Sequence, residues 1–392
     1  MANNSETYSY SPLGDSNKRS KRTYIGTILF IVHLALTISL SVALVISYLT
    51  PHISPKTFGS LTIMGHFAPV LYMLVLICLL LWLIARSWKI AGVVALLLLP
   101  GIPYLSQFYN IAFMRKAEQS AESTNRITVV TYNVRGFYND EGKRVVKDFA
   151  DYIAQSNSFN KEKMRAADVI CLQEFALDAD GVDIIDSLVK SSYKDMYIND
   201  VHESENVVLR TYSRYQIVDS GSIAGMGSGT SQWVDIVIKE KDTLRIFNNH
   251  LYTMSISADD TEDIARGKIL QDGDRMRSIV NRIADNSSIR ASHVDTLRYI
   301  IDNTPYRQIV CGDFNDTPMS YVYSLLSENL YDTFVESGDG YGYTFRPMRG
   351  MLRIDYILYS EGLDVQKYEV DECVMLSDHL PIKATIKLQP KK

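Results

Sequence analysis

The sequence Ile309-Val310-Cys311-Gly312-Asp313-Phe314-Asn315-Asp316 joins an apolar run to two carboxylates and a carboxamide. The apolar run predicts a buried strand, so the polar residues follow in the loop at the end of that strand. Desolvating several charged groups together costs more free energy than it returns unless a cation or a substrate joins them. This stretch therefore predicts a functional site at the end of a buried strand.

The same arrangement recurs along the chain. Six further polar residues stand at or near the ends of other apolar runs: Asn133, Glu174, His250, Asp355, Asp378 and His379. Their repeated position adds them to the candidate site.

From Ile127 onward, apolar and β-branched runs alternate with segments of helical periodicity. The runs that predict strands are 127–132, 168–172, 207–212, 233–238, 244–247, 308–311, 356–359 and 382–388. Helical periodicity falls at 144–153, 274–283 and 294–301. About eight strands with helices between them predict an α/β fold with two packed sheets and helices outside.

Composition divides the chain sharply. Residues 1–115 are apolar and basic, with eight Lys or Arg against two acids. Residues 116–392 hold 32 basic and 43 acidic residues, a net charge of −11, and have the composition of a soluble domain. Because its first 22 residues are rich in Ser, Asn and charge, we expect a disordered basic tail there. The predicted division is a tail at 1–22, a membrane anchor at 23–110 and a catalytic domain at 120–390.

Three apolar stretches, at about 24–49, 61–85 and 90–108, are long enough to cross a bilayer, which takes about 20 residues. Pro100, Gly101 and Pro103 interrupt the third, so a kink or a shorter segment is expected there. The first stretch is too long for the apolar core of a signal peptide, and further spans follow it. A retained three-helix transmembrane anchor in the lipid bilayer is therefore predicted.

Basic residues indicate the orientation of the anchor. Lys18-Arg19-Ser20-Lys21-Arg22 and Arg86-Ser87-Trp88-Lys89 flank the connections expected on the cytoplasmic side, where Lys and Arg accumulate. Three spans then place the catalytic domain on the exoplasmic or periplasmic side, with the bacterial inner membrane as the expected location. Arg115 and Lys116 oppose this weakly. If the third stretch is re-entrant, the domain stays in the cytoplasm.

Six short motifs follow one another in the soluble part. They are Thr131-Tyr132-Asn133-Val134-Arg135-Gly136, Leu172-Gln173-Glu174, Asn248-Asn249-His250-Leu251, Gly312-Asp313-Phe314-Asn315, Arg353-Ile354-Asp355-Tyr356-Ile357 and Ser377-Asp378-His379-Leu380-Pro381. Together they resemble the endonuclease/exonuclease/phosphatase superfamily, which includes deoxyribonuclease I, exonuclease III, neutral sphingomyelinases and inositol-polyphosphate 5-phosphatases. The resemblance covers residues 125–390. It implies a four-layer α/β sandwich, with two packed, mostly antiparallel sheets flanked by helices, here preceded by a transmembrane α-helical region.

Two positions separate the branches of this superfamily. The exonuclease III branch has an Asp two residues after the first Asn, where this chain has Arg135. That branch also has a Tyr-containing motif in place of the one around His250. Both features favour the deoxyribonuclease I and sphingomyelinase side. Asn249 replaces the usual Thr, a conservative polar change beside His250.

A metal site is predicted from the chemistry of the substrate. A phosphodiester is anionic, so attack by water needs charge neutralisation and an aligned nucleophile. Mg²⁺ is usually held by few carboxylates with waters left over. Glu174 is the best candidate ligand, and the resemblance implies the same. Asn133 is expected to contribute an amide, and Asp378 to complete the metal or nucleophile environment. The predicted cofactor is Mg²⁺, with Mn²⁺ or Ca²⁺ as alternatives.

The catalytic roles are predicted residue by residue. Asp313 is expected to accept a proton from the attacking water or to orient it, and Asn315 to hold a phosphate oxygen or the metal-bound shell. His379 is expected to stabilise the pentacoordinate phosphorane, because pairing with Asp355 fixes its tautomer and raises its proton affinity. His250 is expected to protonate the leaving oxygen or to bind a non-bridging one.

The substrate is less sharply predicted. The loop Tyr341–Gly350 is expected to overhang the site, and its Arg346 is a candidate substrate contact together with Asn315 and Asn133. Proteins that grip nucleic acid usually show a basic stripe, whereas this domain is acidic. Local patches could still form from Arg275 with Arg277, or from Arg346, Arg349 and Arg353.

The function expected from these residues is a membrane-anchored, divalent-metal-dependent phosphoesterase that cleaves a phosphodiester by in-line attack of water. A nuclease-like activity ranks ahead of a lipid head-group phosphodiesterase or phosphomonoesterase, so the substrate is a phosphate ester, with nucleic acid among the candidates. A non-catalytic membrane receptor or scaffold that retains the fold is the alternative of a different class. The sequence predicts no oligomeric state.

Overall fold

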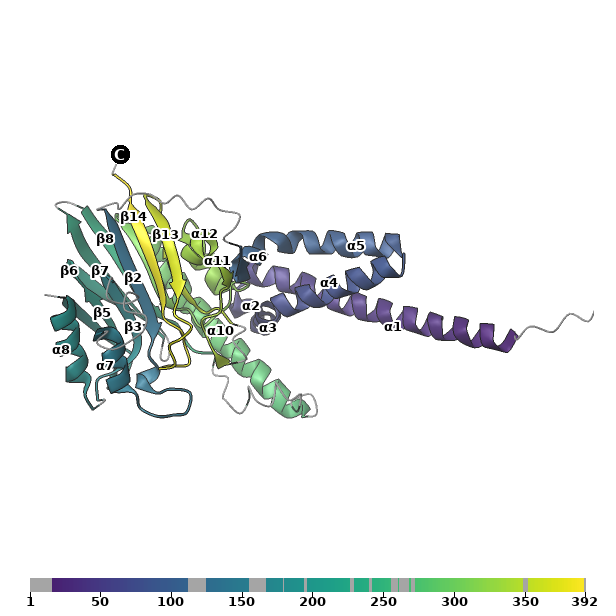
Figure 1. Ribbon diagram of the computed structural model, residues 1–392, viewed down its shortest axis with the longest axis horizontal. Helices are drawn as coiled ribbons and strands as arrows, with labels where there is room; N and C mark the ends of the chain where they lie inside the picture. The colour runs from purple at the N-terminus through teal and green to yellow at the C-terminus, as the bar shows by residue number, and fades with distance from the viewer. Residues whose placement is uncertain are drawn as a thin grey trace, which may run out of the picture.

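The computed structural model describes residues 16–111, 125–154, 167–178, 180–193, 196–225, 229–239, 242–254, 260, 268, 272–347 and 352–390, with side chains from residue 24 onward except at 154 and 190–193. Most of the predicted tail at 1–22 and the basic pair Arg115 and Lys116 therefore lie outside the described residues. Figure 1 shows two regions side by side: a layered α/β sandwich and a bundle of N-terminal helices that extends away from it.

The N-terminal region consists of helices α1 (Ser16–Leu49), α2 (Pro55–Phe58), α3 (Thr62–His66), α4 (Ala68–Ile84), α5 (Trp88–Leu98) and α6 (Ile102–Phe108). Two helical segments, Tyr24–His52 and Trp88–Phe108, are long and apolar enough to cross a membrane. Pro55–His66 and Ala68–Ile84 would form a third span if they are counted together, but they are bent by 55°. The second predicted span is therefore not one straight helix.

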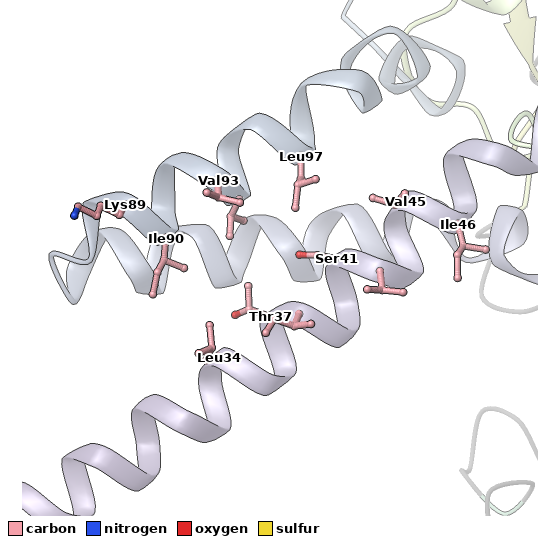
Figure 2. A pocket seen from close by; sticks show the side chains of 12 residues that line it. Leu34, Thr37, Ser41, Val45, Ile46, Lys89, Ile90, Val93 and Leu97 are labelled. Carbon is pink, nitrogen blue, oxygen red and sulfur yellow. The ribbon is translucent and has the colours of Figure 1, made fainter.

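Helices α1, α4 and α5 share a small apolar core around Leu44, Trp82 and Val94. Beside this core, α1 and α5 leave a groove of about 610 Å³. Figure 2 shows Leu34, Thr37 and Ser41 of α1 opposite Ile90 and Val93 of α5. An almost wholly apolar surface of this kind is the expected one for helices that face hydrocarbon, where polar backbone groups must be satisfied within the helix.

The sandwich contains two sheets of six strands. One has the order β10-β12-β9-β8-β7-β6 and the other the order β13-β14-β2-β3-β5-β4. The strands of the first sheet are β6 (Gln216–Ala224), β7 (Thr230–Lys239), β8 (Asp242–His250), β9 (Arg307–Asp313), β10 (Tyr331–Asp332) and β12 (Asp355–Tyr359). Those of the second are β2 (Arg126–Asn133), β3 (Val169–Ala176), β4 (Tyr197–His202), β5 (Val207–Ser213), β13 (Leu363–Val370) and β14 (Ile382–Leu388).

Each sheet has one parallel pair, β8 with β9 and β2 with β3, and all other pairs within the two sheets are antiparallel. Side chains alternate between the faces of a strand. In β2, Ile127 and Val129 therefore pack between the two sheets, while Val130 and Tyr132 pack toward the outer helices. This alternation explains why the strands read as continuous apolar runs: both of their faces are covered.

Helices cover both outer faces (Figure 1). Phe149 of α7 (Val146–Ala154) and Ile185 of α8 (Val182–Tyr193) pack on the second sheet. Val294 of α10 (Gly273–Asp302) and Val322 of α11 (Tyr321–Ser327) pack on the first. The predicted four-layer α/β sandwich, with mostly antiparallel sheets and helices outside, is confirmed.

Two sequence predictions need correction. The segments 274–283 and 294–301 were expected to be separate helices, but they belong to the single helix α10. Its middle turns carry the buried polar residues Asn286, Ser287 and Arg290, which interrupt the apolar periodicity that would have predicted one helix. Strands β4, β6 and β13 were not predicted because exposed polar residues occupy much of their length.

Arg353 is a further correction, because it cannot join a substrate-binding patch. Its guanidinium is buried, lies 2.7 Å from Asp332 and packs over the rings of Phe334 and Tyr356. Arg353 is therefore a structural residue beside α12 (Thr333–Ser337). Arg349, its predicted companion, lies outside the described residues.

Candidate active site

Strand register brings the polar residues of five strands to one edge of the sandwich. In the first sheet His250 is the partner of Asp313, and Asp355 pairs with Asp313 from the other side. In the second sheet Asn133 is the partner of Gln173, which precedes Glu174. Because these residues end β2, β8 and β9, begin β12 or lie near the end of β3, the fold itself assembles the site.

One carboxylate oxygen, Oδ2 of Asp313, lies at the centre of this arrangement. The side-chain amides of Asn133 and Asn315 donate hydrogen bonds to it over 3.0 and 3.2 Å. Nε2 of His379 lies 3.6 Å away and Nε2 of His250 lies 3.9 Å away. Burial raises the pKa of Asp313 to about 6, although the two histidines act to lower it. The structure thus brings four of the predicted site residues around a fifth, the buried carboxylate of Asp313.

Gly312 allows strands β8 and β9 to approach each other closely beside Asp313. Its φ is +128°, and a Cβ there would lie 2.0 Å from the carbonyl oxygen of Asn249 on β8. Contacts that short do not occur, so only glycine fits before Asp313.

Backbone strain is concentrated around the same carboxylate. Arg135, Glu174 and Asn315 have φ values of 48°, 53° and 51°, a conformation that costs a non-glycine residue about 1–3 kcal/mol. At Asn315 the strain is balanced by two hydrogen bonds, from its backbone N–H to Asp313 at 2.8 Å and from its side chain to the carbonyl of Leu251 at 2.8 Å. Strain of this kind persists where a site demands a particular side-chain direction.

His379 forms the predicted pair with Asp355. Its Nδ1 lies 2.9 Å from Oδ2 of Asp355, and both side chains are buried. Burial acts to lower the pKa of His379, but the carboxylates of Asp355 and Asp313 outweigh it and raise the pKa to about 10. His379 is therefore an imidazolium at neutral pH.

His250 has a carboxylate partner that the sequence did not reveal. Its Nδ1 lies 2.7 Å from Oε1 of Glu203, and the other oxygen of Glu203 accepts the backbone N–H of Glu174 at 3.2 Å. Burial lowers the pKa of His250, but Glu203, Glu174 and Asp313 raise it to about 10. Glu203 lies in the turn between β4 and β5, where no apolar run marked it.

The predicted metal ligands are only partly brought together. Glu174 lies beside Asn133, whose side chain donates to it over 3.0 Å, and its carboxylate is 36% exposed. Asp378 instead lies 3.3 Å from Nε of Arg135. Because Oδ1 of Asn133 accepts the backbone N–H of Arg135, its NH₂ group faces the carboxylates. A ligand role for Asn133 and Asp378 stays a prediction.

Within the described part of the chain, Asp313, Asp355 and His379 also place one potential ligand atom each within 4.8 Å of one another. A metal ligand must be deprotonated, whereas both ring nitrogens of His379 face carboxylates and its pKa is raised. This cluster is better understood as a hydrogen-bonded pair, His379 with Asp355, that faces Asp313 across 3.6 Å. The carboxylate of Glu174 suits a hard cation better than this cluster does. Its side chain is partly exposed, and oxygen ligands with room for water are typical of Mg²⁺.

Arg346 lies close to the site. Its backbone N–H donates to the carbonyl of Asp378 over 2.9 Å, and its guanidinium contacts the carbonyl of Ser377 and lies 2.9 Å from Asp140. The guanidinium is therefore already paired, and its predicted substrate contact remains a prediction.

Comparison with known proteins identifies the family. A family model described as the endonuclease/exonuclease/phosphatase family matches residues 130–379, which include every candidate site residue named above. The chain belongs to this family. Members of the endonuclease/exonuclease/phosphatase family are generally hydrolases of phosphoester bonds and commonly use divalent metals. A second model, for a domain of unknown function, matches residues 27–108.

Solved structures of the endonuclease/exonuclease/phosphatase family are also similar. A member from Beutenbergia cavernae is 18% identical with a TM-score of 0.47, covering 68% of this chain and 72% of that one. A member from Bacteroides vulgatus is 16% identical with a TM-score of 0.47, covering 68% and 100%. The human Nocturnin catalytic domain, with bound sulfate, is 18% identical with a TM-score of 0.46, covering 68% and 95%. No curated protein matches the chain.

Ser377 is another residue of the family site that sequence reasoning left without a role. Its hydroxyl donates to the backbone carbonyl of Asn133 over 2.8 Å and accepts the backbone N–H of His379 at 3.2 Å. It therefore ties the loop that carries His379 to the end of β2. The signal was available in the sequence, because Ser377 directly precedes Asp378 in the last motif.

Proposed function

We propose that this protein is a membrane-anchored hydrolase that cleaves a phosphodiester with the help of a divalent cation held at Glu174. The observation that carries the proposal is the set of groups around Oδ2 of Asp313: two amide donors and two histidine rings whose pKa values are raised. Two buried cations and neutral donors around one carboxylate suit an anionic, pentacoordinate transition state, since charge that develops there is met by preorganised donors.

The proposed mechanism assigns one task to each group. Asp313 accepts the proton of the attacking water, which its buried position favours because its pKa is raised toward neutrality. His379, held by Asp355, donates from Nε2 to a non-bridging phosphate oxygen. His250, held by Glu203, donates to the leaving oxygen. Asn315 orients the phosphate.

The proposed cofactor is Mg²⁺, with Mn²⁺ or Ca²⁺ as alternatives. Glu174 would hold the cation, with Asn133 and Asp378 near it. When bound, the cation neutralises phosphate charge. The exposed edge of the Glu174 carboxylate leaves space for the waters that Mg²⁺ usually keeps.

Two substrate classes are supported by different observations. The proposed catalytic groups suit a phosphodiester, which supports a nuclease-like activity as the first candidate. The sandwich, however, is in direct contact with helices that are apolar enough to cross a membrane (Figure 1), which favours a lipid head-group phosphodiester or phosphomonoester as the second candidate. The net charge of −11 over residues 116–392 gives no general attraction for a nucleic acid backbone.

A substrate panel tests this function. We expect the purified full chain with Mg²⁺ to hydrolyse at least one of DNA, RNA, sphingomyelin, phosphoinositides and bis-p-nitrophenyl phosphate. EDTA should abolish the turnover, because the phosphate charge is left unneutralised without the cation. Added Mg²⁺ should restore it. If the protein hydrolyses none of these substrates, a non-catalytic receptor or scaffold becomes the better account.

We further propose that residues 23–110 anchor the protein in the bacterial inner membrane and that the domain at 120–390 lies on the periplasmic side. The basic flanks of the first two apolar stretches support this orientation. Protease added to intact spheroplasts should then digest the sandwich. Protection of the sandwich until the membrane is lysed would place the domain in the cytoplasm, as a re-entrant third stretch requires.

A further inference from the structure

The loop that follows the catalytic motif is enclosed by the N-terminal helices. Oγ1 of Thr50, just after α1, lies 2.6 Å from the carbonyl oxygen of Met319. A Cβ added to Gly65 in α3 would lie 2.1 Å from that same oxygen. A Cβ added to Gly59 would lie 2.6 Å from the carbonyl oxygen of Ala284 in α10. Glycine is therefore required at both positions, because the anchor and the sandwich approach each other through their backbones.

A buried cluster of polar side chains lies at this contact, and its ion pair, Asp316 with Arg290, belongs to the sandwich. Nε2 of His66, at the end of α3, lies 3.3 Å from Oδ1 of Asp316. The other oxygen of Asp316 lies 3.3 Å from Nη2 of Arg290 in α10, and Nη1 of Arg290 donates to the carbonyl of Tyr252 over 2.8 Å. Arg290 is 0% exposed and Asp316 is 1% exposed.

Asp316, and Tyr252 to which Arg290 donates, lie close in sequence to two different residues of the active site. Asp316 directly follows Asn315, and Tyr252 comes two residues after His250. Asn315 also donates to the carbonyl of Leu251, so the two segments are already joined. Buried polar groups that satisfy each other are held in one arrangement, and here Arg290 donates to Asp316 over 3.3 Å. Asp316 also accepts the backbone N–H of Thr317 at 3.0 Å.

We propose that the N-terminal helices are a positioning element of the active site. Through Gly65 and His66 they hold the loop after Asn315, and through Asp316 and Arg290 they fix the backbone beyond His250. None of these residues touches the reacting atoms; they act by keeping Asp313, Asn315 and His250 in register. This inference rests on the proposed phosphoesterase function. A passive tether would need neither the buried hydrogen bond from Thr50 to Met319 nor two glycine contacts with the sandwich.

Matched glycine substitutions in the full-length protein test the inference. Gly65→Ala inserts a methyl group against Met319, whereas Gly92→Ala in α5 meets nothing within 4 Å. With bis-p-nitrophenyl phosphate as substrate, Gly65→Ala should lower kcat at least about tenfold with KM little changed, since small displacements of catalytic groups are costly. Gly92→Ala should match the wild type. Equal kcat for the two variants would overturn the inference.

A second readout needs no substrate. Hydrogen exchange of the amides in residues 313–320 should accelerate in Gly65→Ala and in His66→Ala, but not in Gly92→Ala or in His52→Ala, because His52 is an exposed histidine of the same region. His66→Gln, which keeps a polar side chain beside Asp316 where His66→Ala removes it, should retain slow exchange and kcat. Unchanged exchange in Gly65→Ala and His66→Ala would overturn the positioning role even if the protein is an active enzyme. A wild-type protein that hydrolyses nothing would reject the proposed function, and accelerated exchange would still establish the contact.

Discussion

Asp313→Asn should lower the rate of phosphodiester hydrolysis by about 1000-fold, within the range of roughly 10²–10⁴ that a positioned general base supplies. The substitution keeps the size and shape of the side chain, so the hydrogen bond from the backbone N–H of Asn315 to Oδ1 can remain. It removes the proton acceptor at the centre of the site and turns an attractive neighbour of His379 and His250 into a neutral one. Steady-state kinetics should show the loss in kcat.

The control for this variant is Asp219→Asn, an exposed position on β6. It changes the net charge by the same amount but lies away from the strand ends that form the site, so its kcat should equal that of the wild type. Circular dichroism should show the fold retained in both variants. An Asp313→Asn protein with nearly full activity would remove Asp313 from the mechanism.

His379→Gln should lower kcat by roughly 10²–10³-fold, because it removes a cationic donor from the position where phosphate charge develops. The substitution also leaves Asp355 buried without its partner, and breaking a buried pair in this way costs about 3–5 kcal/mol of stability. Activity and thermal unfolding must therefore be measured on the same samples.

The double variant His379→Gln/Asp355→Asn separates the two effects. Removing both charges relieves the unpaired carboxylate, so thermal stability should recover relative to the single variant, while activity should stay low. If activity recovers together with stability, His379 acts only through folding. The pair of outcomes thus distinguishes a catalytic cation from a structural one.

The dependence on pH follows from the raised pKa of His379, about 10 in the folded protein against 6.5 as its ordinary value. A group whose pKa is raised on folding contributes stability below its unfolded pKa and loses that contribution as pH rises through the folded value. With EDTA present, the wild type should exceed His379→Gln in free energy of unfolding by the full amount below about pH 6.5. This difference should shrink toward pH 10.

Much of the site could be predicted from sequence because its residues close apolar runs. Asn133, His250 and Asp313 each end a strand that its apolar residues predict. The order of the motifs indicated the family. The four-layer fold followed from the same strands. The pair His379 with Asp355 was also predictable, since each belongs to a short motif with fixed neighbours.

The partners contributed by other parts of the chain could not be predicted in this way. Glu203 lies in a polar turn, and only the pairing of β4 with β5 carries it to His250. Arg290 lies in the polar middle of α10, where its burial depends on packing against Asp316 and the N-terminal helices. Whether a charged side chain is buried depends on how the layers of the fold pack together. The local periodicity of the sequence does not predict that packing.

The measurement that tests the central claim most directly is hydrolysis of bis-p-nitrophenyl phosphate by the full chain in ¹⁸O-labelled water with Mg²⁺. The account predicts that water attacks phosphorus at the Asp313 site, that the bond to the p-nitrophenyl oxygen breaks, and that one ¹⁸O appears in the p-nitrophenyl phosphate product. Asp313→Asn should give almost no labelled product. Two results would contradict the account: label in p-nitrophenol, or labelled p-nitrophenyl phosphate formed equally well by Asp313→Asn.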